Sequence, residues 1–222
     1  MAFIQQVTSL TSAITITPSA AGDLYAGLVL GNNALTSLSF SDGGVGNTYG
    51  FTTAVQPVSG SGSLIAFYCL SCKSGATTIT ITPNLGGVNQ ILLDEYSNPG
   101  GFTACQNASA GTSATTNNPG TTTNAISTGS FAASGASALV WGCTVDQNFT
   151  AAAVNAGTGF TARAQGFTTG AYPFFPEDQV TSATSVAATW TAVSAAQSDF
   201  FLQFMLVFTQ ASLTSVPLAW IT

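Results

Sequence analysis

Alternation of apolar and polar residues is the dominant pattern along the chain. The segments AITITP (13–18) and TITITP (78–83) each carry Ile at two alternate positions with Thr between them. Successive side chains of a strand point to opposite faces, so this pattern is typical of an antiparallel strand with one solvated face. Further strands are predicted at 23–30, 35–41, 49–57, 63–70, 90–96, 126–132, 138–145, 160–167, 185–193 and 199–210.

Clusters of Gly, Asn and Ser separate these segments, as turns between short strands do. Helical periodicity is hard to find. We therefore predict an all-β fold, a single antiparallel β-sandwich of jelly-roll type that spans residues 1–210. The longest apolar run, FFLQFMLVF (200–208), is about half as long as a membrane-spanning helix. We interpret it as a buried central strand, and we expect no membrane span.

Two segments do not fit the strand pattern. Residues 107–124 (NASAGTSATTNNPGTTTN) contain no large apolar side chain to bury, so a long surface loop is predicted there. A domain boundary at this loop is the alternative, and it would divide the chain into two similar halves. Residues 211–222 follow the last predicted strand as an apolar C-terminal tail, which a finished sandwich does not need.

Composition narrows the range of functions. Apolar residues make up 45% of the 222 residues and charged residues only 5%, with a formal net charge of −6. Lys73 and Arg163 are the only basic side chains, so neither nucleic acid nor an anionic membrane surface is an expected partner. So little charge leaves little repulsion between copies, which favours a subunit of a crowded assembly. A secreted domain with no need for charge is the alternative.

The glycine-rich stretch SFSDGGVGNTYGF (39–51) could be a phosphate-binding loop or a turn. A phosphate loop lies at a strand-to-helix junction and continues into Lys and Ser or Thr, and this stretch has neither the helix nor the Lys. We interpret it as a tight turn whose glycines supply positive φ angles, with Phe40 and Tyr49 packed across it. Asp42 and Asn47 are weak calcium-ligand candidates.

Enzyme chemistry is disfavoured by the residues available. The chain has no histidine, which removes Ser-His-Asp, Cys-His and imidazole–metal arrangements. Two carboxylate pairs, Asp94/Glu95 and Glu177/Asp178, leave a two-acid glycosidase site open, but adjacent strand residues face opposite ways. We expect these acids to accept hydrogen bonds at sheet rims or to pair with Arg163. No catalytic residue and no cofactor is predicted.

The four cysteines are not spaced as zinc ligands usually are. Cys69 and Cys72 form a CxxC pair that follows a strand instead of opening a helix, while Cys105 and Cys143 are far apart. Disulfide bonds and buried thiols are both consistent with the sequence. The sequons at Asn107 and Asn148 are candidate glycosylation sites if the chain passes through a glycosylating export route.

Aromatic and apolar features give candidate contact surfaces. Trp141 and Trp190 lie on predicted strands, where core packing is the simplest interpretation and stacking on sugars the alternative. The segment YPFFPED (172–178) is predicted as an aromatic loop that covers a sandwich end or fills a neighbour's pocket. The C-terminal tail is predicted either to add a strand to an adjacent subunit or to fold back on its own sandwich. The predicted subunit contacts are Tyr172, Phe174, Phe175, Leu213, Val216, Pro217, Leu218, Trp220 and Ile221.

The order of these segments resembles a β-sandwich domain that recurs in tailed-phage structural proteins and bacterial surface proteins. A strand with GDL (22–24) is followed by LTSLSFSDGGVGNTY (35–49), GATTITITP (75–83) and LLDEYS (92–97). The turn typical of that group matches this chain at Ser41, Asp42, Gly46, Asn47 and Tyr49. The similarity continues through 149–163 and 177–208, and the tail after Gln210 has no counterpart. These motifs are turns and core strands, so the resemblance implies a fold more than a function.

We therefore predict a non-enzymatic structural subunit of a larger assembly, most specifically a phage virion protein that decorates the head or is associated with the tail. An extracellular filament subunit assembled by strand addition and a carbohydrate-binding module are the alternatives. Expected partners are copies of the chain or other virion or fibre subunits, with surface glycans for the third class. The N-terminus lacks a basic stretch followed by an unbroken apolar run, so no secretory signal is predicted. The virion is the expected location, and the cell surface the alternative.

Overall fold

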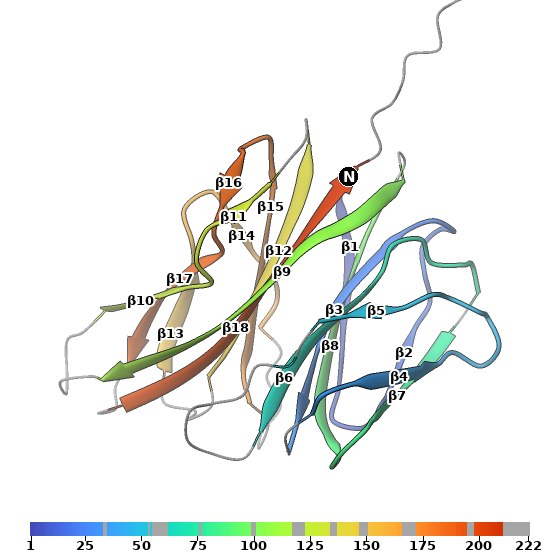
Figure 1. Ribbon diagram of the computed structural model, residues 1–222, viewed down its shortest axis with the longest axis horizontal. Helices are drawn as coiled ribbons and strands as arrows, with labels where there is room; N and C mark the ends of the chain where they lie inside the picture. The colour runs from blue at the N-terminus through green and yellow to red at the C-terminus, as the bar shows by residue number, and fades with distance from the viewer. Residues whose placement is uncertain are drawn as a thin grey trace, which may run out of the picture.

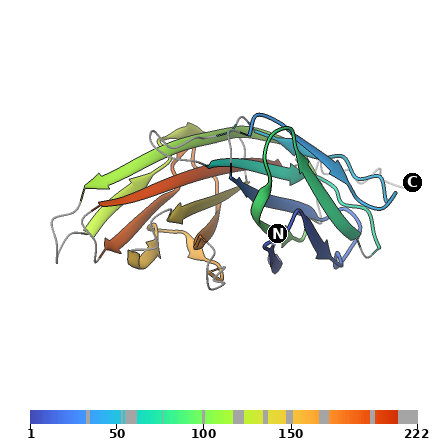
Figure 2. The same cartoon turned by 90° about the horizontal axis from the view of Figure 1, so that it is seen from below.

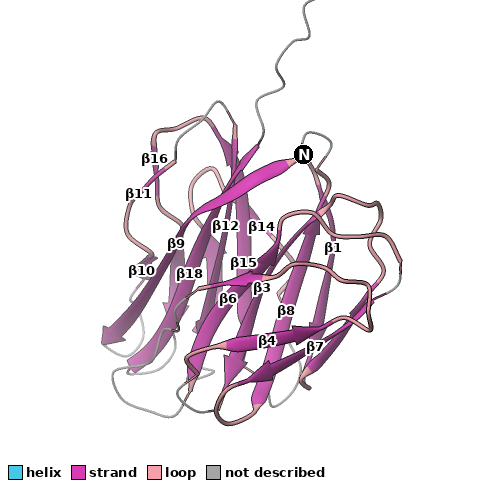
Figure 3. Ribbon diagram, turned by 45° about the vertical axis from the view of Figure 1, so that its right-hand side comes forward, coloured by secondary structure: helices cyan, strands magenta, loops and turns pink. Residues whose placement is uncertain are grey.

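A computed structural model gives the fold. It describes residues 1–222 except 33–34, 53, 55–61, 76, 99–100, 117–122, 134–136, 147–150, 166–171, 195–197 and 211–222. The described residues form strands, turns and irregular segments without any helix (Figure 3), and the strands pair antiparallel in several sheets. The prediction of an all-β sandwich is therefore confirmed.

The first eight strands form the N-terminal half of the molecule, on the blue-to-green side of Figure 1. Five of them make a sheet in the order β1-β8-β3-β6-β5, and the other three make a second sheet in the order β2-β7-β4. The two near copies noted in the sequence are neighbours in the smaller sheet, where Ile14 lies opposite Ile79. The bounds are Phe3–Ser9 (β1), Ala13–Ile16 (β2), Leu24–Gly31 (β3), Leu38–Ser41 (β4), Gly50–Phe51 (β5), Ser63–Cys69 (β6), Thr77–Pro83 (β7) and Val88–Tyr96 (β8).

The remaining strands form the C-terminal half and repeat this arrangement. A five-stranded sheet has the order β14-β15-β12-β18-β9, a three-stranded sheet has the order β10-β17-β13, and β11 and β16 form a short extra pair. The bounds are Phe102–Thr116 (β9), Thr123–Ser127 (β10), Phe131–Ala132 (β11), Ala138–Asp146 (β12), Ala151–Ala156 (β13), Thr161–Ala162 (β14), Phe174–Thr181 (β15), Ser185–Val186 (β16), Thr189–Ser194 (β17) and Ser198–Gln210 (β18).

Both halves have the connectivity of a jelly roll. In each half the first strand pairs with the last, so β1 lies beside β8 and β9 beside β18. The last strand also pairs with a central strand, β3 in one half and β12 in the other. Apart from the extra pair, every strand of one half has a counterpart in the other, and the chain contains the same eight-stranded design twice.

Three hydrophobic clusters hold these sheets together. The two halves lie side by side, as Figure 2 shows, and residues of both five-stranded sheets meet in one cluster between them. The central cluster lies between them and includes Leu28, Leu64, Leu92, Tyr96, Trp141, Phe174, Phe204 and Phe208. The N-terminal cluster lies between the sheets of the first half and includes Ile14, Tyr25, Phe67 and Ile79. The C-terminal cluster does the same in the second half and includes Ile126, Phe175, Trp190 and Met205.

The central strands are buried on both faces, which explains their unbroken apolar sequences. Every residue of β3 and of β12 is buried. Leu28 of β3 faces the central cluster and its neighbour Val29 faces the N-terminal cluster. The run FFLQFMLVF lies in β18 between β12 and β9, with residues 201–208 buried, so its interpretation as a central strand is confirmed.

The predicted loop at 107–124 is wrong over its whole described length, residues 107–116 and 123–124. Residues 107–116 belong to β9 and pair with Ser198–Val207 of β18, and residues 123–124 begin β10. Strand pairing needs only backbone N–H and C=O groups, so a segment of small polar residues can form an edge strand without an apolar face. Residues 117–122 of the predicted loop lie outside the described residues.

A glycine occupies the same place in the two central strands. Gly27 of β3 and Gly142 of β12 both face a jelly-roll interior. A Cβ at Gly27 would lie 2.6 Å from the Leu92 carbonyl oxygen, and one at Gly142 would lie 2.7 Å from Ala188 Cβ. Glycine at these positions therefore allows the strands and their cores to approach closely.

We expect Gly27→Ala and Gly142→Ala each to lower the free energy of unfolding by about 1–3 kcal/mol, because the added methyl group overpacks a filled core. Urea-induced unfolding measures the change. Gly87→Ala is the matched control, since a Cβ there would lie 3.7 Å from its nearest neighbour, Asn32 Nδ2. Equal effects of all three substitutions would contradict the close-approach explanation.

Candidate functional site

The four residues of the two acidic pairs are buried. One residue of each pair points into the interface between the two halves, and the other points away from it. Asp94, Glu95 and Glu177 have no exposed surface, and Asp178 is 5% exposed. Asp94 and Asp178 point into the interface between the two halves, whereas Glu95 and Glu177 bond to groups outside it. This is the alternation expected for adjacent strand residues.

Asp94 lies on β8 and bonds to the opposite half of the molecule. The Trp141 indole Nε1 of β12 donates to Asp94 Oδ2 at 2.7 Å, while Oδ1 has no hydrogen-bond partner among the described residues. Burial, and to a lesser extent the nearby negative charge of Asp178, raise the pKa of Asp94 to about 7 against the hydrogen bonds that lower it. Asp94 is thus a carboxyl group that can carry a proton inside the folded protein near neutral pH.

Asp178 lies on β15 and is the acceptor of a second contact between the halves. The Tyr96 hydroxyl donates to its Oδ2 at 2.7 Å. Arg163 donates from Nη2 to Oδ1 at 2.7 Å and from Nε to Oδ2, which forms a bidentate ion pair. The guanidinium carbon also lies 4.4 Å from the centroid of the Phe3 ring. One of the chain's two basic side chains is thus used to hold the halves together.

Glu95 and Glu177 each hold backbone groups in place. Glu177 accepts from the Gly157 N–H at 2.8 Å and the Thr189 N–H at 3.1 Å, and burial raises its pKa to about 7. Glu95 accepts from the Ser19 N–H at 2.7 Å and from Gln5 Nε2, and burial raises its pKa as well. These contacts agree with the expectation that the acids accept hydrogen bonds or pair with Arg163, but the side chains are buried in the interior and not placed at sheet rims as predicted.

The turn at 42–49 is stabilised by hydrogen bonds to Asp42 and Asn47. Asp42 accepts from the Gly46 N–H at 3.0 Å and the Asn47 N–H at 2.7 Å, and Asn47 Oδ1 accepts from the Lys73 N–H at 2.8 Å. Gly43, Gly44 and Gly46 have positive φ angles. Phe40 and Tyr49 stack with ring centroids 4.7 Å apart, as the turn interpretation expects.

The predicted calcium ligands therefore already have hydrogen-bond partners, Asp42 within the turn and Asn47 at Lys73. Burial acts to raise the pKa of Asp42, but the backbone N–H groups outweigh it and lower the pKa. Donors facing a carboxylate occupy the oxygen lone pairs that a calcium ion would use. Among the described residues, no three His, Cys, Asp or Glu side chains gather into a metal-binding group.

Two shallow grooves lie beside this turn and share Ser71 and Lys73. Their volumes are about 450 Å³ and 610 Å³, and Cys72 lines the larger one. Cys69, Cys72 and Cys143 are buried thiols, and Cys105 is half-buried. A hydrogen bond from Cys72 lowers the pKa of Cys69, whereas burial raises that of Cys72. The structure therefore supports buried thiols and contains no disulfide bond within the part that it describes.

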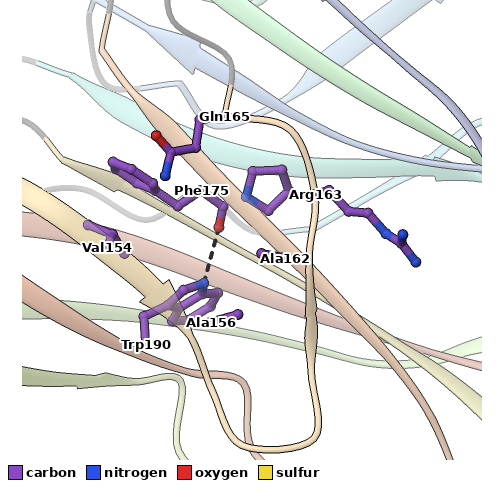
Figure 4. A pocket seen from close by; sticks show the side chains of 8 residues that line it. Val154, Ala156, Ala162, Arg163, Gln165, Phe175 and Trp190 are labelled. Atoms are coloured by element: carbon purple, nitrogen blue, oxygen red, sulfur yellow. Dashed lines mark hydrogen bonds between the residues drawn. The ribbon is translucent and has the colours of Figure 1, made fainter.

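Sugar stacking on Trp141 and Trp190 is wrong, because both side chains are core residues. Trp141 has no exposed surface and Trp190 is 2% exposed. Trp190 Nε1 donates to the Phe175 carbonyl oxygen at 3.1 Å (Figure 4). The cavity beside Trp190 has a volume of about 10 Å³, which is the size needed for a single water molecule.

The aromatic segment at 172–178 is mostly strand, so its predicted role as an exposed contact loop is wrong. Phe174 packs in the central cluster and Phe175 in the C-terminal cluster, because adjacent residues of a doubly buried strand fill the cores on its two sides. Tyr172 is half-buried, and its carbonyl oxygen accepts from Gln90 Nε2 at 2.8 Å.

Other predicted site residues stay predictions. The tail residues lie outside the described residues, as does Asn148, and Asn107 lies within β9. They comprise Leu213, Val216, Pro217, Leu218, Trp220 and Ile221.

The outer edge of β9 is a candidate surface that the sequence pattern did not reveal. β9 has 15 residues and pairs with β18 from Phe102 opposite Gln210 to Thr116 opposite Ser198. No strand of the described part pairs with its other edge. Its backbone N–H and C=O groups on that side can accept an added strand.

Comparisons of the chain with protein-family models, curated proteins and solved structures found no match. No helix that could cross a membrane occurs in the residues that the structure describes.

Proposed function

We propose that the protein is a non-enzymatic structural subunit that assembles with copies of itself or with companion proteins. The observation that carries this proposal is the outer edge of β9, a row of backbone donors and acceptors as long as the strand itself. A long strand edge with which no described strand pairs is a surface on which strands from other chains add. Known ways of blocking an edge include charged side chains, and residues 102–116 contain none.

The low charge of the chain supports the same proposal. The formal net charge is −6 over 222 residues, and one of the two basic side chains is bound to Asp178. Copies can therefore approach with little electrostatic repulsion. The buried acids bind indole, phenol, guanidinium and backbone groups of the protein itself, which supports a role in structure instead of catalysis.

Within this proposal, a phage virion subunit is the more specific candidate, and it rests on the resemblance of the turn at 41–49 and the strands after it. A filament subunit assembled by strand addition is the second candidate. It is favoured by the β9 edge together with the apolar residues 211–222, which are long enough to add a strand to such an edge.

Proline substitution tests the edge. N–H groups of adjacent residues in an antiparallel edge strand point in opposite directions, so one of Ala108→Pro and Ser109→Pro removes a bond to β18 and the other removes only an outward N–H. We expect the variant that keeps the wild-type urea-unfolding midpoint to lose assembly, as measured by light scattering at increasing concentration.

The other proline variant is the internal control and should lose stability by about 3 kcal/mol. Wild-type assembly by the stable variant would refute the role of this edge. The structural function itself would be refuted if neither the wild type nor any variant assembled at the high local concentrations that prevail in a native particle.

Deletion of Leu213–Thr222 tests the tail separately. We expect a folded monomer that no longer assembles, because the apolar tail would be lost as an added strand while both jelly rolls keep their cores. Circular dichroism and size-exclusion chromatography distinguish the outcomes. Loss of folding would show that the tail covers its own sandwich instead.

A further inference from the structure

The repeated strand order allows the two halves to be aligned residue by residue. Gly27 and Gly142 occupy the same place in the central strands β3 and β12, so Ala26 corresponds to Trp141. Ala26 lies opposite Asp94 and Tyr68, while Trp141 lies opposite Leu206 and Asp178. Asp94 therefore corresponds to Leu206, and Tyr68 corresponds to Asp178.

A backbone hydrogen bond that occurs in both halves supports this register. Thr52 N donates to Ala66 O in the first half, and its counterpart Arg163 N donates to Pro176 O in the second, both at 2.9 Å.

The halves face each other as the two copies of a symmetric dimer would. Leu24 lies opposite Tyr96 and Leu139 opposite Phe208, so Tyr96 corresponds to Phe208. Tyr96 of the first half contacts Asp178 of the second, and Phe208 of the second contacts Tyr68 of the first, with ring centroids 5.9 Å apart. The two contacts therefore join the same pair of positions, once from the first half to the second and once from the second half to the first. The interface is therefore isologous, with a pseudo-twofold axis between β3 and β12.

The polar residues of this interface break that symmetry. Asp94 and Trp141 bond to each other, but their counterparts Leu206 and Ala26 are apolar members of the same central cluster. Tyr96 bonds to Asp178, whereas the corresponding contact is between the rings of Phe208 and Tyr68. The donors and acceptors are thus complementary in only one combination of halves.

We propose that the buried pairs Asp94–Trp141 and Tyr96–Asp178 determine specificity, so that an N-terminal half binds a C-terminal half and rejects a second copy of its own kind. The partner surface is the five-stranded sheet of a C-terminal half. This inference does not depend on the proposed function.

A like pair consists of two N-terminal halves or of two C-terminal halves. Its contacts follow when the pseudo-twofold axis relates two copies of the same half. Two N-terminal halves would place Asp94 against Ala26, so that a buried carboxyl group would face a methyl group. Two C-terminal halves would place the Trp141 indole N–H against Leu206 without an acceptor, while Asp178 would face Phe208 and keep only its ion pair with Arg163. Each like pair leaves buried polar groups without partners, which disfavours it relative to the native pair.

The experiment uses the full chain with a specific protease site inserted after Asn98, between β8 and β9. The folded protein is cut, unfolded in urea and refolded by dilution, and native mass spectrometry then measures the three kinds of pair. For the wild-type halves we expect mixed pairs to exceed the random proportion of mixed to like pairs by roughly tenfold or more.

Asp94→Leu places the counterpart residue in the first half and is the decisive variant. It removes the carboxyl group that would face Ala26 in a like pair, and it leaves the Trp141 N–H without an acceptor in the mixed pair. The ratio of mixed pairs to N-terminal like pairs should fall by roughly tenfold. Leu92→Ala, which removes apolar volume from the same cluster, is the control. It removes that volume once from a mixed pair and twice from an N-terminal like pair, so the ratio of mixed to like pairs should not fall.

A random mixture from the wild type, or an unchanged ratio in Asp94→Leu, would overturn the proposal. If the cut halves do not refold, a double-mutant cycle on the intact chain decides instead. Asp94→Leu and Trp141→Phe should together destabilise the protein less than the sum of their separate effects, because the double variant has no unpaired group. Additive effects would overturn the proposal equally.

The same interface also carries a titratable group, whose effect on stability can be measured. Because the pKa of Asp94 is about 7 in the folded protein and near 4 in an unfolded chain, the folded state binds more protons between these values. The free energy of unfolding should therefore fall as the pH rises from about 4 to 7 and level off above it. Asp94→Asn keeps an acceptor for Trp141 but cannot ionise, so urea unfolding at about pH 5 and pH 8 should show a smaller loss than in the wild type. The wild-type loss persisting in full would assign the effect to Glu95 and Glu177 instead, because burial raises their pKa values too.

Discussion

Apolar packing between the two five-stranded sheets is the interaction on which the rest of the structure depends. This central cluster buries large side chains from both halves, among them Tyr96, Trp141, Phe204 and Phe208. Each five-stranded sheet also has a core on its other face, so its central strands have no solvated side. A jelly roll that stood alone would expose one of these apolar faces to water, at a large cost in free energy. The duplication therefore makes each half the cover of the other.

This architecture also explains where the few charged residues lie. Four of the eight acidic side chains belong to the two adjacent pairs, and all four are buried. A buried carboxyl group is tolerated when its oxygens accept hydrogen bonds or when it keeps its proton. The oxygens of Asp178 accept hydrogen bonds from Arg163 and Tyr96. The raised pKa of Asp94 lets that carboxyl group keep its proton. The buried polar pairs of the interface favour an N-terminal half against a C-terminal half, whereas apolar packing alone would also allow two identical halves to pair.

The sequence predicted the fold class better than the arrangement of the strands. Period-two segments such as 78–83 identify strands with one buried face, and the unbroken run at 200–208 identifies a strand buried on both faces, because both patterns are local. β9 was missed because an edge strand of Ser, Thr and Ala is held by backbone bonds to a distant segment. The duplication was missed because corresponding residues such as Asp94 and Leu206 differ in chemistry. At the candidate site, the bonds of Asp42 and the pairing of Arg163 with an acid were foreseeable from residue types, whereas the choice of Asp178 follows from tertiary contacts.

The pairing of the first strand with the last in each half has a consequence for synthesis on the ribosome. Phe3 of β1 lies opposite Tyr96 of β8, so the N-terminal sheet cannot close until its last strand has left the exit tunnel. The second half closes through β9 and β18, which ends at Gln210. Contacts so distant along the chain slow folding, because the ordering of a long loop precedes the interactions that reward it. One apolar face of the first half therefore stays uncovered while more than a hundred further residues are translated and the second half forms. A chaperone would benefit the nascent chain most in this interval.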